Sequence, residues 1–208
     1  MTKSVTTSAI TEVSKFAYNE ALKSLGFKRI GNHLFRPSHD LFHGIHFQAS
    51  RWGSLQEGSF TINLIVTSES LYKFYTGSPL PRNPATALFP IQQRIGRLLP
   101  QRQTYWWSIT SNTDVGALCR EVTSALTQYA LPFFADYPDS SALLNRLRQG
   151  KGLPGLAQPV CRLAHAMLAR EAGCLDEATA QIRTLITEAG TSDRILLIAS
   201  RIGIPYTL

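Results

Sequence analysis

Cysteine is scarce in this chain of 208 residues, which holds only Cys119, Cys161 and Cys174. Three cysteines cannot build a disulfide framework, and all three lie in helical patterns beside apolar residues, where a free thiol behaves as a small hydrophobic group. We therefore expect a protein that folds without disulfides, and we expect it to be cytoplasmic.

Long apolar runs are missing as well. No stretch approaches the roughly 20 apolar residues that a membrane span requires, and Met1–Val5 lacks the apolar core of a signal peptide. We expect neither export nor a membrane partner. The sequence is nevertheless 44% hydrophobic and only 17% charged. This balance is typical of a folded chain, because disordered chains bury too little apolar surface to offset their ordering entropy.

Acidic residues are absent from one long segment. Residues 70–113 contain no acid but five cations, which are Lys73, Arg82, Arg94, Arg97 and Arg102, and the whole chain has a formal charge of +7. A local positive field attracts nucleic acid, phosphate ligands or an acidic protein, and charge by itself does not choose among them. A plain solvated surface is the alternative interpretation.

The arrangements that carry most catalytic chemistry are also lacking. Asp40, Glu57 and Glu69 are scattered through turns, so no pair of carboxylates is placed for acid–base work. The glycine spacing fits neither a phosphate-binding loop nor a nucleophile elbow. Cys161 and His165 lie one helical turn apart in an apolar stripe, which favours packing over nucleophilic catalysis. We expect no catalytic residues and no cofactor.

Histidines near the centre of the chain do not form a metal site. His43 and His46 fall in one expected strand, where they point to opposite faces and cannot easily share an ion. We interpret His43 as a hydrogen-bonded histidine of the sheet, because it has the parity of the apolar residues. His46 has the opposite parity and lies beside Gln48. It is either a plain surface residue or a residue that contacts a ligand.

Two paired strands, over residues 41–50 and 59–67, organise the expected fold. Alternate positions in both runs are apolar, namely Leu41, Ile45, Phe47, Ala49, Phe60, Ile62, Leu64 and Val66. The opposite parity is polar and includes His46, Gln48 and Asn63. Because side chains alternate across a strand, we expect one face packed against helices and one uncovered polar face.

Helical periodicity and turn residues place the other elements. We expect a helix over residues 7–25 that ends at Gly26, a hairpin turn at Gly31-Asn32, a strand over 105–109 and a helix from Thr113 that continues after a kink through 131–134. Four prolines between Ser68 and Pro100 predict mostly irregular structure there. That loop is our first candidate for a binding loop.

The last third of the sequence predicts helices. A short helix after residue 139 is followed by the glycine-rich stretch 150–155, which predicts a linker and divides the chain into domains 1–150 and 151–208. Two helices ending at Gly173 and Gly190 are similar to one tetratricopeptide-like hairpin, and a third begins at Ser192. Without a second copy at a fixed period, no repeat array is predicted.

A series of short motifs resembles one known family. The motifs are, in order, Leu25-Gly26-Phe27-Lys28, Phe47-Gln48-Ala49-Ser50, Phe60-Thr61-Ile62-Asn63-Leu64, Arg94-Ile95-Gly96-Arg97-Leu98, Trp106-Trp107 and Leu131-Pro132-Phe133-Phe134. Over about residues 8–136 this order is similar to the DUF4304 family of uncharacterised bacterial domains. The resemblance implies no activity and no catalytic residue.

The expected protein is an α+β domain, with an antiparallel sheet of five to six strands against two long helices, followed by a C-terminal helical bundle. We expect a non-catalytic domain that recognises a protein partner, and the local positive charge favours an acidic one. A toxin-neutralising immunity protein is an example of such a role. The alternatives are a nucleic-acid-binding module using residues 70–113 and, third, an enzyme. The expected contact residues are His46, Gln48, Asn63, Tyr72, Tyr75, Arg94, Arg97 and Trp106; the C-terminal hairpin is the alternative docking surface.

Overall fold

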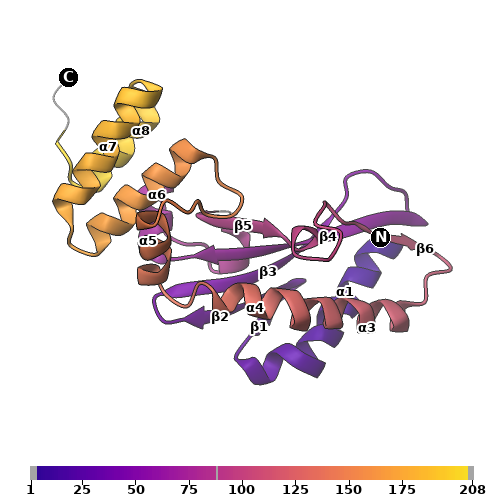
Figure 1. The fold of residues 1–208 in the computed structure, drawn as a ribbon. Coiled ribbons are helices and arrows are strands. Elements are labelled where there is room, and N and C mark those ends of the chain that lie inside the picture. Colours follow the sequence, from indigo (N-terminus) through magenta and orange to yellow (C-terminus); the bar gives the residue numbers. More distant parts are fainter. Residues whose placement is uncertain (1–3, 88, 206–208) are drawn as a thin grey trace.

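The structure is a computed structural model that describes residues 4–87 and 89–205. A six-stranded antiparallel sheet packs against two long helices and is followed by a C-terminal helical part (Figure 1). The expected α+β class is therefore confirmed.

One long strand organises the sheet. The strands are β1 (Lys28–Ile30), β2 (His33–Ser38), β3 (Leu41–Ala49), β4 (Glu57–Thr67), β5 (Ile91–Arg94) and β6 (Trp107–Thr110). They run in the order β1-β2-β3-β4, and the far edge of β4 is shared by β5 and β6, each of which pairs with one half of it. The predicted hairpin turn is confirmed, since Ile30 pairs with His33 and Gly31 has a φ of +58°.

The first face of the sheet is the expected apolar one. Ile45 lies opposite Leu64 and Phe47 opposite Ile62, and neither strand exposes more than 4% of any large apolar side chain on this face. Directly paired residues share a face, so the register joins both apolar sets into one surface. That surface supplies the centre of the hydrophobic core.

Two long helices cover this apolar face. The first is α1 (Val5–Ala17), which continues through the π turn η1 (Tyr18–Leu22) and the 3-10 turn η2 (Lys23–Leu25). The second runs from α3 (Val115–Ala125) through the π turn η5 (Leu126–Ala130) into α4 (Leu131–Ala135). Gly26 ends the first helix with a φ of +81°, as predicted. Pro132 lacks the N–H that would bond one turn back, and the π turn precedes it.

Residues 68–100 are more regular than their prolines predicted. They contain α2 (Glu69–Thr76), η3 (Pro84–Thr86), β5 and η4 (Ile95–Arg97), so the expectation of mostly irregular structure is wrong for α2 and β5. Ser68 caps α2 by accepting a hydrogen bond from the Leu71 amide. Pro79, Pro81 and Pro90 fall between these elements, and Pro84 opens η3, where its missing N–H is not needed.

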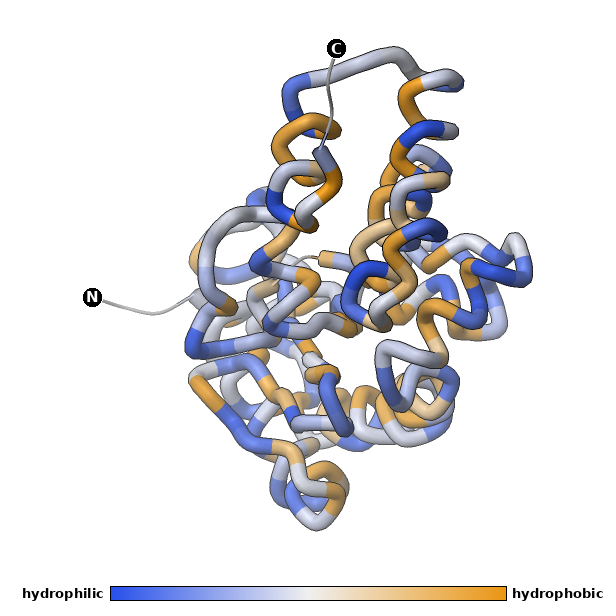
Figure 2. The backbone as a smooth tube through the Cα atoms, turned by 90° about the vertical axis from the view of Figure 1, so that its left-hand side faces the viewer, coloured by the Kyte–Doolittle hydropathy of each residue, from blue (hydrophilic) through white to orange (hydrophobic). Residues whose placement is uncertain are grey.

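The C-terminal part consists of α5 (Ser140–Arg148), α6 (Gln158–Glu171), α7 (Leu175–Ala189) and α8 (Asp193–Arg201). The predicted helix ends at Gly173 and Gly190 are confirmed, with φ values of +79° and +76°. In Figure 2 the last helices rise from the rest of the molecule, and apolar and polar residues alternate along their turns. Cys174 precedes α7 as its N-cap residue rather than lying within a helix.

The glycine-rich connection between α5 and α6 packs against the rest of the protein. Leu153 is 3% exposed, and Gly155 lies so close to the Gln92 carbonyl of β5 that a Cβ would collide with it. The buried residues form one continuous cluster that reaches from Ala9 to Ile204. The division at residue 150 into two domains stays a prediction.

Candidate functional site

A row of four polar residues crosses the second face of the sheet. His33 of β2 pairs with His46 of β3, His46 pairs with Asn63 of β4, and Asn63 pairs with Arg94 of β5. Because paired residues point to the same face, these side chains follow one another across four strands. We call His33, His46, Asn63 and Arg94 the polar row.

A second line of side chains runs beside the polar row. Gln48 pairs with Thr61, and the Asn63 Nδ2 donates a hydrogen bond of 2.8 Å to the Gln48 Oε1. Trp107 is buried against Phe60 on the apolar face. Strand alternation therefore places Trp106 on the second face, where its ring lies 5.4 Å from the Arg94 guanidinium.

The prediction that this polar face is uncovered is wrong for its centre. Thr61, Asn63 and Thr67 are all 0% exposed. The chain returns across the sheet through η3, and Ala85 approaches so closely that a Cβ added to Gly44 would lie 2.8 Å from the Ala85 Cα. A strand pattern shows which side chains share a face, but it does not show which later segment covers them.

The sides of the site remain partly open. His33, His46, Gln48, Arg94 and Trp106 are half-buried. The result is a site with a closed floor, made by Thr61 and Asn63, and an accessible rim. Its side chains can reach a ligand or partner without any movement of the strands.

Burial controls the charge of the two histidines. It lowers the pKa of His46 to about 4, with a smaller contribution from the charge of His33, and it also lowers the pKa of His33. Their rings lie 4.7 Å apart, so two imidazolium charges there would repel each other. The polar row therefore holds two neutral imidazoles beside the permanent cation Arg94.

Several polar atoms of the site are buried without a hydrogen-bond partner among the described residues. They are the Nδ1 atoms of His33 and His46, the Asn63 Oδ1 and the Thr61 Oγ1. Buried polar groups nearly always have partners in folded proteins. These atoms therefore leave the interior of the site with unsatisfied hydrogen-bonding capacity.

The other predicted contact residues lie apart from this site. Arg97 is exposed on η4. Tyr72 and Tyr75 belong to α2, which begins beyond the Thr67 end of β4. The Tyr75 ring is stacked on Phe89 at 3.7 Å and covered by the Arg194 guanidinium at 4.2 Å. The structure thus brings together His46, Gln48, Asn63, Arg94 and Trp106, but not the two tyrosines.

One member of the polar row was missed by the sequence analysis. His33 was given no role, although pairing counted back from the turn at residues 39–40 places it opposite His46. The signal was therefore available in the hairpin register. The contact across to Arg94 had no comparable local signal, since β5 follows β4 by more than twenty residues.

The loop between β3 and β4 lies at one end of the sheet, where the Leu55 carbonyl accepts a hydrogen bond of 3.0 Å from the Val5 amide at the start of α1. Trp52 is 79% exposed and Leu55 is 62% exposed. The Arg51 guanidinium lies 6.0 Å from the Trp52 ring. Ser59 pairs with Ser108 between this loop and the polar row. This loop thus exposes two large apolar side chains at the end of the sheet that lies beyond Ser59.

The residues of the site suit binding through hydrogen bonds and charge. The polar row and its neighbours contain no carboxylate or thiol, and within residues 4–87 and 89–205 no three His, Cys, Asp or Glu side chains gather as potential metal ligands. In the same ranges, no helix is both long and apolar enough to cross a bilayer. What the site offers is amide and imidazole groups, one guanidinium and an indole face.

Comparison with known proteins identifies one family. No curated protein and no solved structure matches the chain. The family model of DUF4304, described as a domain of unknown function, matches residues 18–136, which is more than half of the sequence. That range contains all six strands and the whole polar row. The chain therefore belongs to the DUF4304 family, as its motifs indicated.

Proposed function

We propose that this protein is a non-catalytic recognition domain that binds a protein partner along the second face of its sheet. The observation that carries the proposal is the exposure of Trp52, at 79%, beside Leu55, at 62%, on one loop. A tryptophan can bury roughly 150–250 Å², so this loop leaves a large apolar area in water. A partner that covers this loop removes the apolar area from water, and this burial stabilises the complex.

The composition of the surface supports protein recognition. Tryptophan and arginine dominate the residues that carry binding energy in interfaces. Two such pairs are present: Trp52 with Arg51 on the β3–β4 loop, and Trp106 with Arg94 on the second face. The half-buried Trp106 is already held in place, so binding costs it little conformational entropy.

The charge favours an acidic partner. Arg94 and Arg97 belong to the segment 70–113, which has no acidic residue. Positive potential steers an acidic protein during encounter and raises its association rate more than its final affinity. A toxin-neutralising immunity protein of a bacterial cytoplasm is the biological role that we propose, and this part rests on analogy with other small non-catalytic domains.

Nucleic-acid binding is the second candidate, and the Arg94–Trp106 pair supports it. Bases stack on exposed indole rings while arginine neutralises phosphate. Such binding would weaken steeply with salt, because each neutralised phosphate releases condensed counterions. Fluorescence anisotropy with labelled single- and double-stranded oligonucleotides at two salt concentrations separates the candidates. Strong binding that Arg94→Gln abolishes would favour nucleic acid.

The first prediction concerns Trp52. Tagged wild-type protein and the Trp52→Ala variant are used to recover partners from native host cells, and the affinity of each recovered protein is then measured after purification. We expect Trp52→Ala to weaken binding by at least tenfold, about 1.4 kcal/mol, because interface tryptophans commonly contribute that much or more.

Leu197→Ala is the matched control, since Leu197 is 50% exposed on α8, away from the proposed surface. It should bind like the wild type. Equal binding by the wild type and Trp52→Ala would contradict the proposed surface. Loss of binding in Leu197→Ala alone would place the partner on the C-terminal helices instead.

A further inference from the structure

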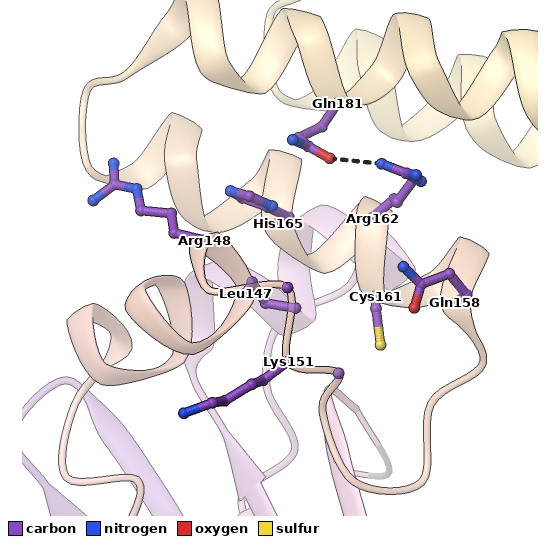
Figure 3. A pocket seen from close by; sticks show the side chains of 10 residues that line it. Leu147, Arg148, Lys151, Gln158, Cys161, Arg162, His165 and Gln181 are labelled. Carbon is purple, nitrogen blue, oxygen red and sulfur yellow. Dashed lines mark hydrogen bonds between the residues drawn. The ribbon is translucent and has the colours of Figure 1, made fainter.

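A second polar site lies outside the residues that match the family. It is a half-open cavity of about 270 Å³ between α5, the connection 149–157, α6 and α7 (Figure 3). Arg148 and Lys151 line it from α5 and the connection. Gln158, Arg162 and His165 line it from α6, and Gln181 lines it from α7.

The lining of this cavity is basic. Residues 140–170 contain Arg146, Arg148, Lys151, Arg162 and Arg170 and no acidic residue. This acid-free stretch is denser in cations than the one between residues 70 and 113, and the sequence analysis overlooked it. Arg148, Lys151 and Arg162 are among the residues that line the cavity, and no acidic side chain lines it.

Ion pairs hold two of the cations in position. Arg148 forms a two-point contact with Glu177, with N–O distances of 2.9 and 2.6 Å, and the His165 Nε2 donates to the same carboxylate at 2.7 Å. Arg148 is the main reason that the pKa of Glu177 falls to about 2. Arg162 contacts Glu188 at 2.7 Å. Glu177 and Glu188 are thus each bound to an arginine, and these ion pairs hold the side chains of the cavity wall in place.

Unused binding capacity remains after these contacts. Lys151 makes no ion pair among the described residues. The Arg162 Nε is buried and has no hydrogen-bond acceptor in the described part of the chain. In Figure 3 the Arg162 and Gln181 side chains point toward each other, and Lys151 comes from the connection on the other side. The cavity therefore carries one positive charge more than its paired carboxylates neutralise.

We propose that this cavity binds a small organic phosphate. An oxyanion supplies the negative charge that Lys151 lacks, and guanidinium and ammonium groups are the usual phosphate donors. Buried Leu147 and Cys161 add an apolar wall, against which a short carbon chain packs. A cavity of about 270 Å³ admits a ligand of that size.

Calorimetric titration at constant ionic strength tests this inference. The probes are inorganic phosphate, glycerol 3-phosphate and, for comparison, acetate. We expect saturable binding of both phosphates, with glycerol 3-phosphate the tighter, and at least tenfold weaker binding by Lys151→Gln and Arg162→Gln. Arg82→Gln, which removes an exposed cation from the other acid-free segment, should bind like the wild type.

Lys151→Gln keeps the test decisive even if Arg162→Gln disturbs the packing of α6 on α7, because Lys151 is exposed. Three outcomes would overturn the inference: no saturable binding of either phosphate, unchanged binding by Lys151→Gln, or an equal loss in Arg82→Gln. Acetate binding as tight as that of glycerol 3-phosphate would overturn the choice of phosphate. None of these outcomes bears on the sheet-face proposal.

Discussion

At the scale of single residues, two histidines three positions apart have different roles. His46 points to the second face and joins the polar row, whereas His43 points to the apolar face and is 1% exposed. The His43 ring stacks on Phe134 at 4.6 Å, and its Nε2 donates to the Tyr137 carbonyl at 2.8 Å. His43 is thus the hydrogen-bonded sheet histidine that its parity predicted.

The second prediction is a pH dependence of stability caused by His43. Burial, reinforced by the nearby Arg36 charge and opposed by the Tyr137 hydrogen bond, lowers the pKa of His43 from 6.5 to about 4. Between pH 6.5 and 4 the unfolded chain therefore binds a proton that the folded chain excludes. The free energy of unfolding should fall as the pH falls through this window, by about 3 kcal/mol in full and roughly 2 kcal/mol at pH 5.

Urea denaturation at pH 7 and pH 5 measures this loss. His43→Gln keeps a donor for the Tyr137 carbonyl but cannot take up a proton, so its stability should depend less on pH in the same window. His46, whose pKa is also about 4, is intact in both proteins and contributes equally. A variant with the same pH dependence as the wild type would show that His43 is not the cause.

At the scale of elements, the contact between η3 and β3 decides how open the second face is. Pro84 and Ala85 are both buried, and Ala85 approaches β3 at Gly44. The absence of a side chain at Gly44 lets the chain cross the sheet there. That crossing helps to bury the centre of the face and leaves the polar row at its border.

The third prediction is that Gly44→Ala destabilises the protein by about 1–3 kcal/mol, the usual cost of overpacking. Its Cβ would lie 2.8 Å from the Ala85 Cα and 3.0 Å from the Ala85 Cβ, so backbone must move. Thermal denaturation followed by circular dichroism measures the effect. Gly152→Ala is the control, since its Cβ would meet only the Cys161 Sγ, at 3.8 Å, which is an ordinary van der Waals distance. Unchanged stability in Gly44→Ala would disprove the close contact.

At the scale of the whole molecule, the C-terminal helices are attached through the end of α2. The Arg201 Nη1 of α8 donates to the carbonyls of Phe74 and Tyr75, at 3.2 and 2.9 Å. Arg194 covers the Tyr75 ring, and Ser70 donates to Glu171 of α6. Residues more than 100 positions apart in the sequence thus meet. Tyr75, which the sequence predicted to contact a partner, contacts Arg194 and Arg201 of α8.

The fourth prediction is that Arg201→Gln loosens α8 without unfolding the sheet. The change removes the donor to two carbonyls, a loss on the order of 1–3 kcal/mol. Hydrogen exchange should become faster for the amides of α8 and stay slow for β3 and β4, because local opening then needs less free energy than global unfolding. Arg183→Gln, at an exposed position of α7, is the control. Unchanged protection of α8 would refute the role of Arg201.

The sequence by itself determined the two faces of the central strands and the ends of several helices, although it missed α2 and β5. Alternation in β3 and β4 placed His46, Gln48 and Asn63 on one face, and glycines marked the ends of α1, α6 and α7, because side-chain periodicity and positive φ are local properties. Only the tertiary structure decided what each face meets. The burial of Asn63, the return of η3 over Gly44 and the assembly of the phosphate-sized cavity depend on contacts between distant segments, which local sequence patterns do not record.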